Sequence, residues 1–359
     1  MPWLRLAHRW LGGLIGLLLA VLGLTGTLLL HKDAYLRATL PHATDLLAQN
    51  TTTVVAALTR IFADPADRPR SVVLASEHLG VHRLYYSSDE AGAYANQSGQ
   101  VIERWSSIWQ RPEVWVLDLH HHLLSGDTGE LIAGIGALIG LGFVITGMIL
   151  WWPSRRLFKL KLWPGRMNRV GIVHHHRDVG VVVAPLLALS LLTGATMNFD
   201  WLATFLVSGL STPKEMDAAR APPKARGGDL AAQIDWPTVV HAARTPYPDA
   251  DLRFVALPAK PGGLITVRMR QPAEWLPNGR TTLWFDPANG RLVAHRNGQT
   301  LPLGVRVANV EFPLHAGKVG GLAYRLLMTA SGLSLTLLGT LTVITFWGNP
   351  SGRQKRVQR

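Results

Sequence analysis

The chain has 359 residues, of which 48% are hydrophobic, and a formal net charge of +13 at neutral pH. It contains no cysteine, which excludes disulfides, iron–sulfur clusters, thiolate metal sites and haem attached covalently through Cys-x-x-Cys-His. The positive charge is concentrated in segments 1–9, 153–169 and 348–359, which hold 12 of the 36 Lys and Arg residues and no acidic residue. Because these segments border apolar runs and form no single basic face, nucleic acid is excluded as a partner.

Four apolar runs are long enough to cross a bilayer, which takes roughly 20 residues. They are Trp10–Leu30, Leu131–Trp152, Val179–Met197 and Leu322–Trp347. The first run exceeds the apolar core of a signal peptide and no small-x-small cleavage site follows it, so we expect a retained span. The positive-inside rule then predicts that both termini and 153–169 are cytoplasmic, with 31–130 and 198–321 on the outer side.

The predicted segments follow one another in chain order as alternating spans and outer modules. They are a first span at 1–30, an outer module at 31–118, a second span at 119–152, a basic cytoplasmic loop at 153–169, a third span at 170–198, a second outer module at 199–313, a fourth span at 314–347 and a basic cytoplasmic tail at 348–359. Each module has one helix candidate, at 50–62 in the first and 234–244 in the second. Strand-like stretches follow at 70–76, 82–88 and 96–105 in the first module and at 252–258, 263–270, 281–287 and 286–296 in the second. This order predicts a small α+β fold for each module. The Pro- and Ala-rich stretch 211–229 is typical of a mobile linker.

The two halves of the chain repeat the same short motifs in the same order. His8-Arg9 opens the first span and His176-Arg177 opens the third, and a Leu-Thr-Gly follows with 17 residues from His to Thr in both. His120 precedes Trp152 by 32 residues, as His315 precedes Trp347. Several matches in register predict an internal duplication with both copies in the same orientation.

Histidines near the spans fall at two depths. A helix rises 1.5 Å per residue, so the 23 residues from His8 to His31 correspond to about 35 Å, the two faces of the hydrocarbon core. Histidines 174–176 begin the third span, level with His8. Histidines 120–122 and His315 precede the second and fourth spans, level with His31.

Two layers of imidazole on separate helices are suited to ligating haem iron from both sides of the macrocycle. Two haems would then give an electron path across the membrane, and glycines of the first two spans would leave room for the flat rings. The other interpretation of any one histidine is a polar residue at a helix end; the repetition favours ligation for His8, His120, His176 and His315.

Several further residues are candidates for the cofactor sites. His31 has no counterpart in the second half, and His174 or His175 could replace His176 because neighbours on a helix point about 100° apart. Arg9 and Arg177 follow the inner ligands and either bind haem propionates or supply positive-inside charge. The histidines at 42, 78, 82, 241 and 295 are expected at the surface.

The stretches "LAHRWLGGLIGLLLAVLGLTG", "DLHHHLL…GFVITGMILWWP", "HHHRDVG…LSLLTG" and "FPLHAGKVGG", with the closing strand "TLWFDPANGRLVA", resemble the PepSY-associated transmembrane family. The resemblance covers nearly the whole chain. It implies a four-helix transmembrane bundle with two small PepSY-like periplasmic modules, and similarity to the inner-membrane ferric-siderophore reductases of Gram-negative bacteria. It also implies two b-type haems with bis-histidine ligation, carried over to His8, His120, His176 and His315. The runs at 120–122 and 174–176 leave the ligand within each run open.

We therefore predict a multi-pass protein of the bacterial inner membrane that reduces a ferric siderophore or other ferric chelate in the periplasm. The chain lacks a Gly-x-Gly-x-x-Gly in a strand–helix setting, so the electron donor is expected to be a membrane quinol or a cytoplasmic reductase. One alternative is a membrane-anchored pair of modules that bind peptides or proteases without redox activity. A metal or chelate transporter is the other, and the lack of carboxylates within the spans argues against it.

Overall fold

The computed structural model describes residues 1–88, 90–158 and 169–348, and the chain divides into two compact units. One unit comprises residues 1–30, 115–203 and the chain from 314 onward; the other comprises 31–114 and 204–313. These divisions differ by a few residues from the predicted boundaries at 118 and 198. The reason is that the short helices α4 (Pro112–His122) and α7 (Asp200–Leu206) extend across the divisions. Most of the predicted basic loop and tail lies outside the described residues.

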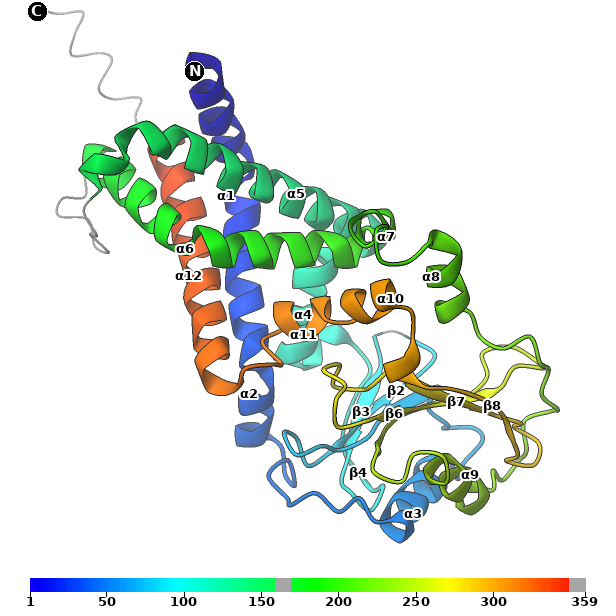
Figure 1. The fold of residues 1–359 in the computed structure, drawn as a ribbon. Helices are drawn as coiled ribbons and strands as arrows, with labels where there is room; N and C mark the ends of the chain where they lie inside the picture. The colour runs from blue at the N-terminus through cyan, green and yellow to red at the C-terminus, as the bar shows by residue number, and fades with distance from the viewer. Residues whose placement is uncertain (89, 159–168, 349–359) are drawn as a thin grey trace, which may run out of the picture. The chain divides into compact units, whose positions relative to one another are not determined.

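The first unit contains four long apolar helices, each long enough to cross a membrane (Figure 1). They are α1 (Pro2–Leu30), α5 (Gly126–Trp151), α6 (Arg169–Asn198) and α12 (Gly321–Trp347). Within hydrocarbon a helix satisfies every backbone polar group internally, and side chains such as Leu14, Leu17 and Ile145 present exposed apolar surface. The prediction of a membrane protein with four long apolar helices is confirmed.

Helices α1 and α12 lie against each other through glycines. A Cβ added to Gly16 would lie 2.9 Å from the Gly339 carbonyl oxygen, and one added to Gly23 would lie 2.7 Å from that of Gly332. Small residues at such contacts let two helix backbones approach closely. The expectation that the span glycines make room for macrocycles is therefore wrong for Gly23, which serves helix packing instead.

The second and fourth spans begin later than predicted, because a break separates each from the histidine before it. The first break places Leu123, Leu124 and Gly126 at φ of 47°, 58° and 57° between α4 and α5. The second follows the short helix α11 (Glu311–His315) and places Gly317, Gly320 and Gly321 at φ of 60°, 67° and 61°. The predicted spans 119–152 and 314–347 are thus each a short helix, a left-handed break and a long helix. Past its end at Trp151, α5 is followed by a 3-10 turn, η2 (Trp152–Leu157).

The second unit is built on one antiparallel sheet of eight strands in the order β4-β3-β2-β1-β5-β6-β7-β8. Residues 31–114 supply β1 (Ser71–Val73), β2 (His82–Tyr85), β3 (Gly92–Ala95) and β4 (Val101–Trp105). Residues 204–313 supply β5 (Asp251–Ala256), β6 (Ile265–Arg270), β7 (Thr281–Phe285) and β8 (Leu292–Arg296). The sequence predicted two separate modules; the structure joins them, because β1 pairs with β5 with Val72 opposite Val255.

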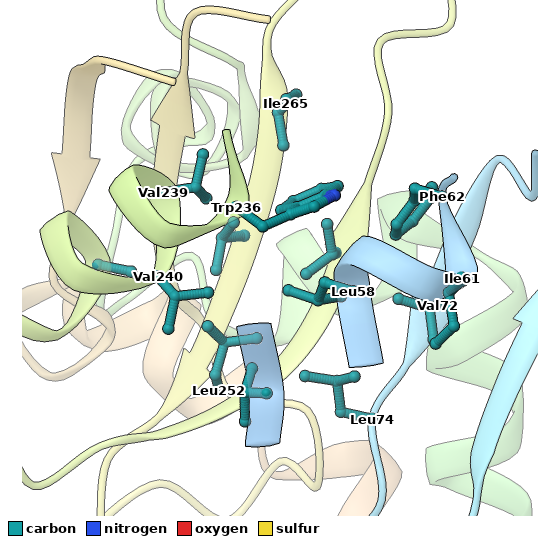
Figure 2. Close-up of a cluster of buried hydrophobic side chains, with 14 of the residues drawn as sticks. Leu58, Ile61, Phe62, Val72, Leu74, Trp236, Val239, Val240, Leu252 and Ile265 are labelled. Atoms are coloured by element: carbon teal, nitrogen blue, oxygen red, sulfur yellow. The ribbon is translucent and has the colours of Figure 1, made fainter. Parts of the chain in front are cut away.

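The main core of this unit lies between the sheet and two helices, α3 (Thr51–Ile61) and α9 (Trp236–Arg244), as Figure 2 shows. Both helices were predicted, and each begins at a side-chain cap, Asn50 and Asp235 respectively. The Trp236 ring packs on Phe62 from the other half, with centroids 5.0 Å apart. The two halves therefore share one core as well as one sheet.

A smaller cluster corrects the predicted linker at 211–229. Helix α8 (Pro213–Arg220) forms there, because Thr212 and Glu215 make a capping box and Met216 is buried against Val305. The remaining elements of this unit are α2 (Lys32–Thr39), η1 (Ile108–Gln110), η3 (Gly298–Thr300) and α10 (Leu303–Ala308).

His82 is the second correction within this unit. It was predicted at the surface, but it is only 5% exposed and its Nδ1 accepts a hydrogen bond from the Ala75 backbone N–H at 2.9 Å. Burial lowers the pKa of this imidazole from 6.5 to about 4.

Candidate cofactor-binding site

Two of the predicted ligands meet near the beginning of two spanning helices. His8 on α1 and His176 on α6 have ring centroids 6.4 Å apart and ring planes 89° apart. We call them the inner pair. His8 lies in the second turn of α1 and His176 in the third turn of α6, so the regular helical backbone fixes the position and direction of each side chain.

A cavity of about 430 Å³ opens beside the inner pair. Its walls are mainly apolar and small, with Gly12, Gly140 and Phe143 among the lining residues. A largely apolar cavity with a few polar groups at defined points is the usual form of a cofactor site.

Positive charge lines the same cavity. Arg5, Arg9 and Arg177 all border it. The guanidinium of Arg9 lies over the Phe346 ring, 5.8 Å from its centroid, and Arg177 Nε donates to the buried carboxylate of Asp178 at 2.7 Å. Arg5 and Arg9 can therefore accept an anionic group near the histidines, whereas Asp178 already offsets part of the charge of Arg177.

The other two predicted ligands meet on the short helices that precede the breaks. His120 on α4 and His315 on α11 have ring centroids 6.1 Å apart and ring planes 42° apart. We call them the outer pair. Gly26 of α1 and Gly194 of α6 leave space for these rings, because an added Cβ would lie 3.0 Å from His120 Cε1 and 3.3 Å from His315 Cε1.

Each of the four rings is held at Nδ1 by a threonine hydroxyl of a long helix. The Oγ1–Nδ1 distances are 2.8 Å for Thr146 and His8, 3.4 Å for Thr342 and His176, 2.9 Å for Thr25 and His120, and 3.1 Å for Thr193 and His315. Sequence reasoning noted Thr25 and Thr193 only as part of a repeated Leu-Thr-Gly, and it missed Thr146 and Thr342. The "ITG" at 145–147 was a usable signal, whereas nothing in the sequence marks Thr342.

The structure separates the members of the two histidine runs. In the first run the His120 ring is paired with His315 of the other half, His121 is exposed, and His122 Nδ1 is 2.9 Å from Asp118 Oδ1. In the second run His176 lines the cavity, His174 is exposed, and His175 is buried with no hydrogen-bond partner for Nδ1 among the described residues. The geometry thus favours His120 and His176 within their runs.

His31 belongs to neither pair. It is the N-cap residue of α2 and falls in the other unit. The outer pair lies level with Thr25 rather than with His31 at the end of α1. The 17 residues from His8 to Thr25 place the two pairs about 26 Å apart along the helix, closer than the predicted 35 Å.

Haem is the group to test against these distances. Metal–imidazole bonds are about 2 Å long, and a ring centroid lies roughly 1 Å behind its ligating nitrogen, so two axial imidazoles have centroids about 6 Å apart. The inner and outer pairs, at 6.4 and 6.1 Å, fit this requirement. Within residues 1–88, 90–158 and 169–348, no three His, Cys, Asp or Glu side chains come together as a metal site.

A family model described as the PepSY-associated TM region matches residues 5–349. The match includes α1 from Arg5 onward, the other three long helices, both halves of the sheet and both histidine pairs. No curated protein matches the sequence.

Proposed function

From the premise that this chain belongs to the PepSY-associated TM family, we propose that it is a di-haem electron-transfer protein of the bacterial inner membrane. It would reduce a ferric siderophore or another ferric chelate on the periplasmic side. The observation that carries the proposal is the presence of two histidine pairs, each with one ring from either half of the chain and with ring centroids 6.4 and 6.1 Å apart.

The arrangement of the two halves supports an origin by internal duplication. His8 and Thr25 of α1 have the same separation as His176 and Thr193 of α6, and each half gives one histidine to each pair. A protein that holds two equivalent cofactors at two depths is what this repetition would produce.

Charge supports the proposed orientation. The basic residues of 1–9 adjoin the inner pair, and the basic segments 153–169 and 348–359 follow α5 and α12. By the positive-inside rule these ends are cytoplasmic, which puts the outer pair and the sheet unit on the periplasmic side.

Haem, when bound, supplies reversible one-electron exchange between Fe(III) and Fe(II). The histidine pairs would hold it at two depths. At the inner site Arg9 would neutralise propionate charge, and Arg177, which also pairs with Asp178, would do so in part. The mainly apolar walls of the inner cavity lower the local dielectric constant, which strengthens those charge interactions.

The proposed direction of electron transfer, from the cytoplasmic to the periplasmic side, indicates the class of substrate and of electron donor. Transfer of one electron to a ferric chelate outside yields Fe(II), which siderophore-type ligands hold weakly, so the metal is released. The electron comes from a separate partner, a membrane quinol or a cytoplasmic reductase, that reaches the inner pair.

Purification from membranes followed by a reduced-minus-oxidised optical spectrum tests the proposal. We expect a low-spin b-type spectrum and two haems per chain by pyridine haemochrome assay. The variant His8→Ala should retain one haem, because only the inner pair loses a ligand.

The matched control is His174→Ala, which removes an exposed histidine of the same helical layer and should retain both haems. A colourless wild-type protein that is folded, by circular dichroism and gel filtration, would rule out the redox function and leave the alternative of a membrane-anchored pair of binding modules.

A further inference from the structure

The threonine contacts at the two histidine pairs indicate which ring nitrogen of each histidine carries the hydrogen. We use the name span threonines for Thr25, Thr146, Thr193 and Thr342. Each span threonine also donates to the backbone carbonyl four residues earlier in its own helix, at 2.7 Å in every case: Val21, Gly142, Leu189 and Leu338.

A hydroxyl has one proton. Because that proton is given to the helix carbonyl, the threonine oxygen has only lone pairs to offer the histidine. The histidine must therefore be the donor, which places its hydrogen on Nδ1. This assignment holds for each of the four rings.

His315 supports the assignment by a second contact. Its Nδ1 also lies 3.1 Å from the backbone carbonyl oxygen of Ser190. A carbonyl can only accept a hydrogen bond, so this contact independently requires a proton on Nδ1. The two acceptors at this ring, Thr193 and Ser190, agree.

We propose that the span threonines are positioning residues that lock all four imidazoles in the Nδ1–H tautomer and leave Nε2 free to ligate iron. A neutral imidazole with hydrogen on one nitrogen has its lone pair on the other. Metal-bound histidines usually donate this second N–H to an acceptor, which fixes the ring orientation and raises the basicity of the ligating nitrogen. The inference rests on the proposed function for the identity of the metal group.

At three of the four sites the residue after the span threonine is a glycine that leaves room for the histidine ring. Gly26, Gly147 and Gly194 each lie beside the ring that the preceding threonine holds, with an added Cβ at 3.0 to 3.7 Å from the ring Cε1 atom. One residue accepts the Nδ1 proton and the next leaves room for the ring. The repeated Thr-Gly therefore has a chemical explanation at the ligand rather than in helix packing alone.

Thr25→Val and Thr25→Ser separate the hydrogen bond from the side-chain volume. Valine keeps the branched shape and removes the acceptor, whereas serine keeps a back-bonded hydroxyl. We expect Thr25→Val to weaken retention of one haem by 10- to 100-fold and to raise the midpoint potential of that haem, because a less basic imidazole favours Fe(II). Thr25→Ser should restore both values towards wild type.

Thr340→Val is the matched control, because Thr340 is an exposed back-bonded threonine of α12 whose hydroxyl donates to Thr336 at 2.8 Å. It should leave the haem content and both potentials unchanged. If wild type binds two haems and Thr25→Val keeps both with unchanged potentials, the positioning role is refuted and the proposed function stands. If wild type binds no haem, both fail. Gel filtration and a thermal melt of each variant identify loss of haem through misfolding. If Thr25→Val misfolds, the haem content and midpoint potential of Thr25→Ser decide: values near wild type support the positioning role, and loss of one haem from a folded Thr25→Ser refutes it.

Discussion

The two connections that follow the outer histidines both turn the chain from a short helix into a long helix, but they use different residues at positive φ. In the first half, the chain turns from α4 into α5 through Leu123 and Leu124, both at positive φ, before reaching Gly126. In the second half, the turn from α11 into α12 uses Gly317, Gly320 and Gly321. Non-glycine residues in the left-handed region cost about 1 kcal/mol or more each, so the first connection stores strain that the second avoids.

The difference indicates which feature each half has to keep. Both halves hold a histidine on a short helix and then change direction, and each ring lies close to a threonine hydroxyl, at 2.9 Å for His120 and 3.1 Å for His315. The left-handed break is therefore common to the two halves, while the residue type that makes it is not. The four predictions below test how far the equivalence of the halves extends, from the largest expected effect to the smallest.

Removal of the outer ligands should affect the two halves equally. We expect His120→Ala and His315→Ala each to lose one of two haems completely, because either change removes one of the two histidines that would hold that haem. His121→Ala should lose none, since His120 is the member of that run paired with His315. Haem-to-protein ratios from pyridine haemochromes measure this. Equal loss in His120→Ala and His121→Ala would mean that the pairing does not select the ligand.

The halves should differ in their response to acid. His82 begins β2, whereas the fully buried Ile265 begins the corresponding strand β6. The pKa of His82 falls from 6.5 to about 4 on burial, so between these values the unfolded chain binds a proton that the folded chain does not. Protonation would also break the bond that Nδ1 accepts from Ala75. The free energy of unfolding should therefore decrease by about 3 kcal/mol as the pH falls from 6.5 to 4.

Melting curves of the full chain in detergent at several pH values measure this decrease. His82→Asn is the control, because its amide oxygen can replace Nδ1 as acceptor and does not titrate. It should be less sensitive to acid than wild type. Identical pH profiles for the two proteins would exclude His82 as the source.

The glycines beside the rings should show a graded response. An added Cβ meets His120 at 3.0 Å from Gly26, His315 at 3.3 Å from Gly194 and His8 at 3.7 Å from Gly147. We expect Gly26→Ala to disturb the outer haem most, at a cost of about 1–3 kcal/mol, Gly194→Ala less, and Gly147→Ala hardly at all. Haem retention during dilution into apomyoglobin measures the order. A reversed order would show that these contacts do not limit the ring positions.

The strained connection should be improved by the residue that the other half uses. Leu124→Gly relieves a left-handed leucine that is 39% exposed, so we expect a gain of up to about 1 kcal/mol in unfolding free energy. Gly320→Ala should destabilise, because its Cβ would lie 2.7 Å from Tyr324 Cβ at φ of 67°. Thermal unfolding in detergent compares the two. Destabilisation in both variants would show that Leu124 contributes packing that outweighs its strain.

Much of this architecture could be predicted, because the lengths of the apolar runs and the repeated motifs indicate it. The four spans, helices α3 and α9 and most strands follow from such patterns. Strand β3 was missed, because Gly92–Ala95 is short and lacks the β-branched residues that indicate a strand. Helix α8 was missed because prolines and charges around it concealed its capping box.

The sequence predicted which histidines come together, but not the threonines that contact them. Repetition identified one histidine from each half at each depth. It did not reveal that Thr342 lies beside His176, because the two are far apart in the sequence and meet only when α6 packs on α12. Nor did it reveal the breaks, since two leucines at positive φ contradict local preference and are held by the surrounding fold.

The β1–β5 pairing also has a consequence for biogenesis. Until residues 251–256 emerge, β1 has an unpaired edge of backbone donors and acceptors, which is a template for association with another chain. At translation rates of about 5–20 residues per second, this interval lasts on the order of ten seconds or more. The completed sheet thus joins strands that are synthesised early with strands that are synthesised late. A nascent chain that stalls before its second half should be prone to aggregate through the unpaired edge of β1.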